Sequence, residues 1–124
     1  MIKLLLISGS LFCCLSVIMG AFGAHALKDK ISEYSMSIYD KAVLYQTFHA
    51  FGVLFVAIIG QVFNTEDFNI CGILFIFGIL LFSGSLFLLA ITDIKWLGAI
   101  TPIGGTFFII GWIVLIIKIW GLEI

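Results

Sequence analysis

The side chains most able to do chemistry in this chain are two histidines, each beside a long apolar run. His25 follows a stretch of small residues. His49 lies one helical turn after Tyr45, and Gln46 shares that side of the helix. An ionisable group within a membrane span should face the other helices and find a partner there. We therefore expect a polar pocket near one leaflet, and its candidate residues are His25, Tyr45, Gln46, His49, Ser85 and Thr101.

The residue types limit what chemistry such a pocket could perform. A catalytic metal site needs three protein ligands, and no cysteine or carboxylate lies near the two histidines in sequence. The chain also shows no Ser/His/Asp arrangement, glycine-rich phosphate loop or paired carboxylates. We expect that the protein is not an enzyme and that it binds no metal and no cofactor. A haem held by both histidines, or a quinone site, is the least favoured alternative.

Composition and charge spacing place these residues in a membrane protein. Hydrophobic residues make up 63% of the 124 positions and charged residues only 10%. Charged side chains are missing from four long stretches, and roughly 20 helical residues cross a bilayer core. A span must satisfy its backbone internally, which favours helices. The sequence predicts an all-α integral membrane protein, one domain over 1–124, with four transmembrane helices in an antiparallel bundle. Their expected ranges are about 4–25, 39–62, 69–91 and 99–120.

The segment between the first two predicted helices is amphipathic. Apolar residues recur at helical spacing from Leu27 to Ile38, with charged residues on the other faces. This pattern is typical of a short segment lying in the membrane interface. Ser32 is one candidate cap for the second helix, and Ser37 with Asp40 is another. The sequence leaves both starts open.

Glycines mark where helices should pack closely. In lipid, association depends on close backbone approach through small residues. The first helix carries Gly20 and Gly23, and the fourth carries Gly104, Gly105 and Gly111. We expect these five to lie at helix contacts. Pro102 suits the first turn of the fourth helix.

The depth of the polar residues suggests a function class. Most polar residues of the predicted helices lie toward the two larger loops, so one half of the bundle should be polar and the other half apolar. We expect a structural or accessory membrane protein. The alternative is a small transporter or ligand-binding protein that uses His25, Gln46, His49 and Thr101. Every carboxylate lies outside the spans, which counts against proton-coupled export.

Lysines indicate the orientation. Lys28, Lys30, Lys41 and Lys95 lie on the side of the two larger loops, against Lys3 and Lys118 on the other. The positive-inside rule then puts both termini outside. The expected partners are the lipid bilayer and a second copy or another membrane protein. The formal net charge of −1 argues against nucleic acid.

The N-terminal segment has a second interpretation. Lys3, the apolar run and the Ala24-His-Ala26 triplet also fit a cleavable signal. The apolar run exceeds the usual length of a signal's hydrophobic region, so we expect an uncleaved span.

Four motifs together resemble a known family. They are GAFGAHAL at 20–27, YQ-x-x-HA at 45–50, Ser-Gly-Ser at 83–85 and TPIGG…GW at 101–112. Their order along the chain is similar to that of the YgdD/YwdK type of small membrane protein, which includes the animal transmembrane protein 256 and is classed as a domain of unknown function. The resemblance implies four transmembrane helices and a bacterial inner membrane, and no established activity. It adds Pro102 and Trp112 to the residues of interest without giving them roles.

Overall fold

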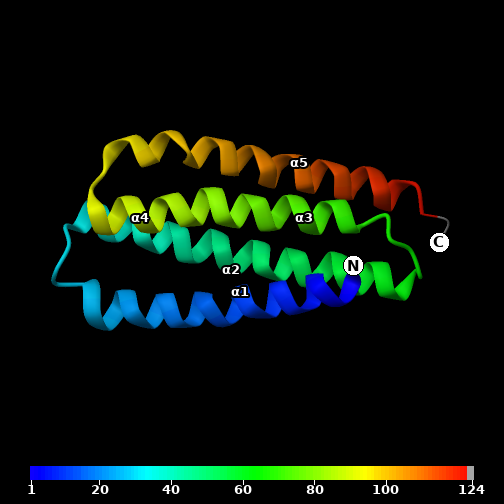
Figure 1. Ribbon diagram of the computed structural model, residues 1–124, viewed down its shortest axis with the longest axis horizontal. Coiled ribbons are helices and arrows are strands. Elements are labelled where there is room, and N and C mark those ends of the chain that lie inside the picture. The colour runs from blue at the N-terminus through cyan, green and yellow to red at the C-terminus, as the bar shows by residue number, and fades with distance from the viewer. Residues whose placement is uncertain (123–124) are drawn as a thin grey trace.

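The computed structural model describes residues 1–122, and every element within that range is helical (Figure 1). The α-helices are α1 (Ile2–Phe22), α2 (Glu33–Val62), α3 (Asn69–Gly78), α4 (Gly84–Thr92) and α5 (Thr101–Trp120). Two π-helical turns, η1 (Gly23–Leu27) and η2 (Ile79–Ser83), and one 3-10 turn, η3 (Lys95–Ala99), complete the fold. All are continuations of neighbouring helices.

These elements join into four helical spans. They cover Ile2–Leu27, Glu33–Val62, Asn69–Thr92 and Lys95–Trp120, and each is long and apolar enough to cross a membrane. The prediction of an all-α chain with four such helices is confirmed. The observed spans extend beyond the predicted ranges because charged residues near a span end can still be helical. α3, η2 and α4 form the third span, called that from here on.

The amphipathic segment predicted between the first two helices divides in the structure into a short loop and the first turns of α2. α2 begins at Glu33, and the loop before it is only 28–32. Ser32 caps the helix by accepting the backbone N–H of Ser35 at 3.0 Å, which decides between the two candidate starts. Ile38 and Tyr39 are buried against α4. These side chains therefore pack inside the bundle.

The four spans lie in chain order (Figure 1). α2 and the third span form the centre, α1 packs mainly on α2, and α5 packs mainly on the third span. The described N-terminus and the α2–α3 loop lie at one end, called the terminal end. The loop at 28–32 and the turn before η3 lie at the opposite loop end. Because α1 and α5 each have one main neighbour, much of their surface is left for lipid.

Two apolar cores hold the centre together. The larger core lies toward the terminal end and includes Leu5, Val53, Val56, Phe75 and Leu115. The smaller one lies toward the loop end and is built from Ile38, Tyr39, Ala42, Leu86, Phe87 and Ala90. Between them, polar side chains enter the bundle.

Two glycines of α5 allow that helix to approach the third span closely. A Cβ added at Gly104 would lie 2.3 Å from the backbone nitrogen of Phe82, and backbone cannot move aside locally. A Cβ at Gly111 would lie 2.6 Å from the Phe75 ring. Gly105, by contrast, has only ordinary contact at 3.7 Å. The contact between α5 and η2 therefore depends on Gly104.

The predicted packing glycines of the first span also differ from each other. Gly23 is tight, since an added Cβ would lie 2.5 Å from the Tyr39 ring. Gly20 has only ordinary contact with Val43 at 3.6 Å. One tight position and one loose position thus stand three residues apart on the same helix.

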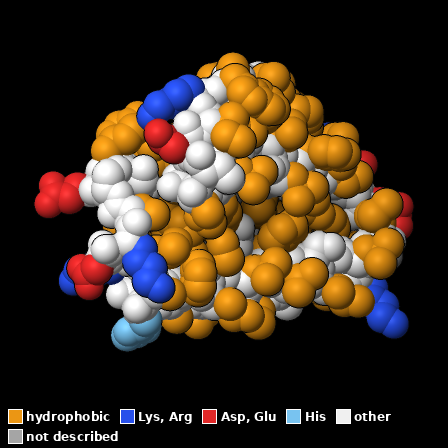
Figure 2. Space-filling model, turned by 60° about the vertical axis from the view of Figure 1, so that its left-hand side comes forward, with side chains coloured by type: hydrophobic (Ala, Val, Ile, Leu, Met, Phe, Trp, Pro, Cys, Tyr) orange, Lys and Arg blue, Asp and Glu red, His pale blue; other side chains and the backbone are white. Residues whose placement is uncertain are grey.

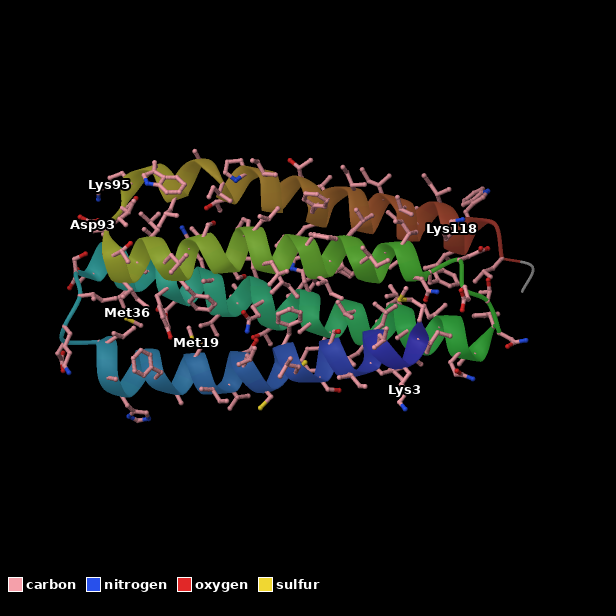
Figure 3. All side chains as sticks on the ribbon, in the orientation of Figure 1. Lys3, Met19, Met36, Asp93, Lys95 and Lys118 are labelled. Atoms are coloured by element: carbon pink, nitrogen blue, oxygen red, sulfur yellow. The ribbon has the colours of Figure 1, made fainter. Side chains whose placement is uncertain are left out.

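The outer surface matches a lipid environment. Hydrophobic side chains cover most of the face shown in Figure 2, and charged ones lie toward its two ends. Figure 3 places Lys3 and Lys118 toward the terminal end, and Asp93 and Lys95 at the loop end. Asp93 and Lys95 form an exposed ion pair at 2.6 Å.

Candidate functional site

His49 is the centre of the polar cluster inside the bundle. Its ring Nδ1 lies 2.8 Å from the Tyr45 carbonyl oxygen, one turn earlier on α2. The Trp112 indole N–H donates to its Nε2 at 3.1 Å. Because an indole can only donate, Nε2 must be the unprotonated nitrogen, and Nδ1–H donates to the carbonyl. His49 is therefore a neutral imidazole with both nitrogens hydrogen-bonded.

Aromatic rings surround this imidazole. Phe108 of α5 stacks on it with centroids 3.4 Å apart and planes 7° from parallel. Phe75 of α3 and Phe48 of α2 contact it at tilted and edge angles. His49 is only 3% exposed, so this hydrogen-bonded ring sits in an apolar cage. Its hydrogen bonds offset the cost of burying a polar group there.

A groove opens beside this cage, between α2 and α5, with a volume of about 610 Å³. Its lining residues come from α2, η2 and α5: Leu44, Tyr45, Phe48, His49, Phe82, Gly105, Phe108, Ile109 and Trp112. We call it the α2–α5 groove. The backbones of these two helices lie apart here, because α5 packs mainly on the third span, and side chains such as those of His49 and Phe108 bridge between them. Volumes of this order suit a small ligand.

The predicted polar pocket is not one site, because His25 lies elsewhere. His25 is in the π-helical turn η1 and is exposed on the outer surface of the first span. The face of this span that meets α2 carries Gly23 and Met19 instead, where the Tyr39 hydroxyl donates to the Met19 carbonyl at 2.7 Å. The partners of His49 come only from α2, α3 and α5. The helix rotation set by packing thus separates the two histidines.

The remaining candidates divide into separate pairs. Gln46 is buried and its side-chain N–H donates to the Phe12 carbonyl of α1 at 3.3 Å. The hydroxyls of Ser85 and Thr101 lie 2.7 Å apart and join α4 to α5. Of the six predicted residues, only Tyr45 and His49 line the α2–α5 groove. Gln46, one position after Tyr45, points to the other side of α2 because adjacent helical residues face different directions.

The sequence analysis missed the phenylalanines of the site. Phe108 stacks on His49, and Phe82 lines the groove from η2. A signal for Phe108 did exist in the spacing of α5. Its buried positions are Gly104, Phe108, Gly111 and Leu115, which is the pattern of one helix face. In a helix that is apolar all round, that face stands out only through its glycines.

The π-helical turn η2 positions part of the groove wall. π turns in helices occur frequently at functional sites. Here the turn presents its backbone at Leu81 and Phe82 to Gly104 of α5. The same turn directs the Phe82 ring against Tyr45, with centroids 4.6 Å apart. The close helix contact and the groove wall therefore come from one irregular turn.

The geometry gives no support to the haem alternative. Within residues 1–122, no three His, Cys, Asp or Glu side chains gather in a way that could hold a metal ion. Both nitrogens of His49 already have partners, and a metal would have to displace Trp112 or the Tyr45 carbonyl. A haem held by both histidines would also need His25 to turn inward.

Comparison of the sequence with known proteins identifies its family. A family described as "Protein of unknown function (DUF423)" matches residues 19–105. A UPF0382 membrane protein of Staphylococcus epidermidis is 50% identical over 117 residues, which cover 93% of each chain. That of Staphylococcus haemolyticus is 49% identical over 118 residues, 94% of each chain. That of Staphylococcus saprophyticus is 46% identical over 115 residues, covering 93% of this chain and 95% of its own.

No solved structure matches the chain. The sequence matches cover nearly its whole length, include the motifs around His25, His49 and Pro102, and involve relatives named as membrane proteins. They confirm the resemblance found in the sequence and agree with four membrane-length helices. The chain belongs to the DUF423 family of UPF0382 membrane proteins.

Proposed function

We propose that this protein has an accessory role in the bacterial inner membrane. In this role it binds another membrane protein or a second copy within the bilayer, without catalysis or transport. One observation carries this proposal: within residues 1–122 the buried polar side chains of the spans, Ser83 excepted, have hydrogen-bond partners inside the protein. His49, Gln46 and the Ser85–Thr101 pair all have hydrogen-bond partners. Such networks fix how helices pack, and they leave little to line a path for solutes.

The half of the bundle toward the terminal end supports the same conclusion. Its core is made of aliphatic, phenylalanine and cysteine side chains, including Leu5, Phe68 and Cys71, that are almost fully buried. An ion crossing this core would lose its hydration without replacement groups, at a high cost in free energy. A solute path would need a large rearrangement of close-packed helices.

The orientation is part of this proposal. The loop end carries four lysines, Lys28, Lys30, Lys41 and Lys95, and the terminal end carries Lys3 and Lys118. Following the positive-inside rule, we place the loop end in the cytoplasm and both termini outside. A phosphatase that is active only outside the cytoplasm, fused after the last residue, should be active. Activity only when the fusion is made within 28–32 would reverse the orientation.

A flux assay tests the accessory role against transport. Purified protein reconstituted in lipid vesicles should leave proton and potassium leakage equal to that of empty vesicles. A matched preparation with Gly104→Val, which should pack poorly, controls for leakage from misfolded protein. Saturable proton or potassium flux through the unaltered protein, absent in that control, would contradict the proposal.

A photo-crosslinking assay tests whether the protein contacts a specific protein neighbour, as the accessory role requires. Photo-reactive residues placed singly at exposed positions of α1 and α5, such as Val17 and Ile113, would sample both outer spans in native membranes. A discrete product from one face, and none from the other, is expected for a specific neighbour. Lipid adducts alone from both faces would argue against any protein partner.

Ligand binding is the second candidate function, favoured by the α2–α5 groove. The notion of a pocket shared by His25, Gln46, His49 and Thr101 is replaced by a groove in which only His49 of those four takes part. Its opening lies between membrane-spanning helices, so a ligand would enter from the bilayer.

A further inference from the structure

The α2–α5 groove has an unusual lining for a membrane protein surface. Six of its nine lining residues carry rings: Tyr45, Phe48, His49, Phe82, Phe108 and Trp112. Along α5 the lining runs from Gly105 to Trp112, which is about 10 Å of helix rise. A slot of this length matches one flat ring system better than a whole lipid chain. Flat rings gain from offset or edge contacts with such walls.

One hydrogen-bond donor in the groove is without a protein partner. Within residues 1–122 the Tyr45 hydroxyl makes no hydrogen bond, although that of Tyr39, the buried tyrosine of the same helix, does. The Tyr45 ring is held in place against Phe82 and Phe108. Tyr45 lies four residues after Lys41, about 6 Å deeper along α2, so its hydroxyl is near the leaflet surface of the loop end.

The floor of the groove excludes charged ligands. His49 is neutral, with both nitrogens occupied by Trp112 and the Tyr45 carbonyl. No Lys, Asp or Glu lines the groove. The site therefore offers flat ring faces, one free donor near the leaflet surface and no charge. Its best match is a neutral, flat, conjugated ring with an acceptor oxygen at its edge.

We propose that the α2–α5 groove binds the ring of a quinone-type lipid, with a ring carbonyl accepting a hydrogen bond from the Tyr45 hydroxyl and the apolar tail extending into the bilayer. This inference rests on ligand binding as the second candidate function and is independent of the accessory role. It concerns binding alone, with no electron transfer to the protein.

Two other occupants fit the groove less well. A helix of a second copy would need small residues at the contact, and Gly105 is the only small residue of the lining. Side chains such as Phe48, which is 60% exposed, stand in its way. A phospholipid acyl chain fits any apolar surface, but it leaves the Tyr45 hydroxyl unpaired and gains nothing from flat walls.

Trp112 provides a direct readout of the groove. The other two tryptophans, Trp96 and Trp120, are exposed at the span ends, so Trp96→Phe and Trp120→Phe should leave the fold intact. In that background, protein in lipid nanodiscs would be titrated with an alkyl-1,4-naphthoquinone. We expect saturable quenching of Trp112 fluorescence. Collisional quenching by quinone dissolved in the lipid would instead rise linearly without saturation.

Variants separate the groove from the surrounding lipid. Tyr45→Phe keeps the ring and removes the hydroxyl, and should weaken binding about fivefold. Gly105→Leu should abolish saturation, because Gly105 has room for a Cβ and a longer side chain fills the groove. Tyr34→Phe is the matched control, since Tyr34 is exposed at the loop end and outside the groove, and should change nothing. Melting curves would show that each variant is folded.

Three results would overturn the inference. Quenching of Trp112 that rises linearly with quinone concentration would mean that the groove holds no binding site. Equal affinity of Tyr45→Phe and the unaltered protein removes the hydrogen bond from the argument. Competition by an alkylbenzene with the same tail, or saturable quenching by a phospholipid with brominated acyl chains, assigns the groove to apolar chains. In that last case ligand binding as a function survives and only the quinone assignment fails.

Discussion

The two outer spans, α1 and α5, are attached to the central pair by different means. α1 is held through its backbone: Tyr39 donates to the Met19 carbonyl at 2.7 Å, and Gln46 donates to the Phe12 carbonyl at 3.3 Å. Figure 3 shows Met19 and Met36 between α1 and the start of α2. α5 is held by side chains, through the Trp112–His49 hydrogen bond and stacked rings.

This difference predicts how each interface responds to substitution. A backbone carbonyl is present whatever the residue, so the first span can change at most positions without losing its hydrogen bonds, the tight Gly23 excepted. The α5 interface needs particular side chains in particular places, and a glycine where α5 meets η2. We therefore expect substitutions at α5 to cost more stability than substitutions at α1.

The largest effect is expected for Gly104→Val. Its added Cβ would overlap the backbone at Phe82, so α5 must move away from η2. We expect a loss of about 3 kcal/mol or more, seen as a large drop in melting temperature by circular dichroism in detergent. The control is Gly105→Ala, one residue on, where a Cβ makes ordinary contact and should be tolerated. Similar melting of the two variants would refute the close contact.

The next effect is expected for His49→Leu. The change leaves the partly buried Trp112 N–H without a partner and should cost about 2 kcal/mol. His25→Leu is the matched control, because His25 is exposed and its loss should be close to neutral. Thermal melting of both proteins in the same detergent would compare them. Equal destabilisation would mean that the depth and pairing of His49 do not matter.

A smaller effect is expected at the α1 interface from Tyr39→Phe. The ring stays packed against Phe87 while the bond to the Met19 carbonyl is lost, at a cost of about 1 kcal/mol. Tyr34→Phe removes a hydroxyl from an exposed residue and serves as the control. Hydrogen exchange should also speed up around Met19 in the first variant only. A cost above that of His49→Leu would reverse the ranking of the two interfaces.

The smallest effect is expected for Gln46→Leu. The hydrogen bond to the Phe12 carbonyl is long at 3.3 Å, and interhelical hydrogen bonds in membranes average about 0.6 kcal/mol. A change in melting temperature near the error of the measurement is expected. A large loss would show that Gln46 has a role that this single bond does not explain.

Much of the fold could be predicted, and the candidate site only in part. The charge-free stretches marked all four spans, since length and apolarity alone decide whether a helix can cross a bilayer. The importance of His49 followed from its depth. The link to His25 failed because proximity along the membrane normal says nothing about which way a helix is turned. α1 turns Gly23 inward and His25 outward.

The chain of amino acids by itself determined that this protein is a four-span membrane protein of its family, because hydropathy and motif order are properties of a linear sequence. The rotation of each helix was decided only in the folded bundle, where the Gly104 contact with η2 and the Trp112–His49 pair come into being. A helix that is apolar on every side carries no periodic signal for its inner face. Side-chain packing must therefore choose that face, and with it which polar residues meet.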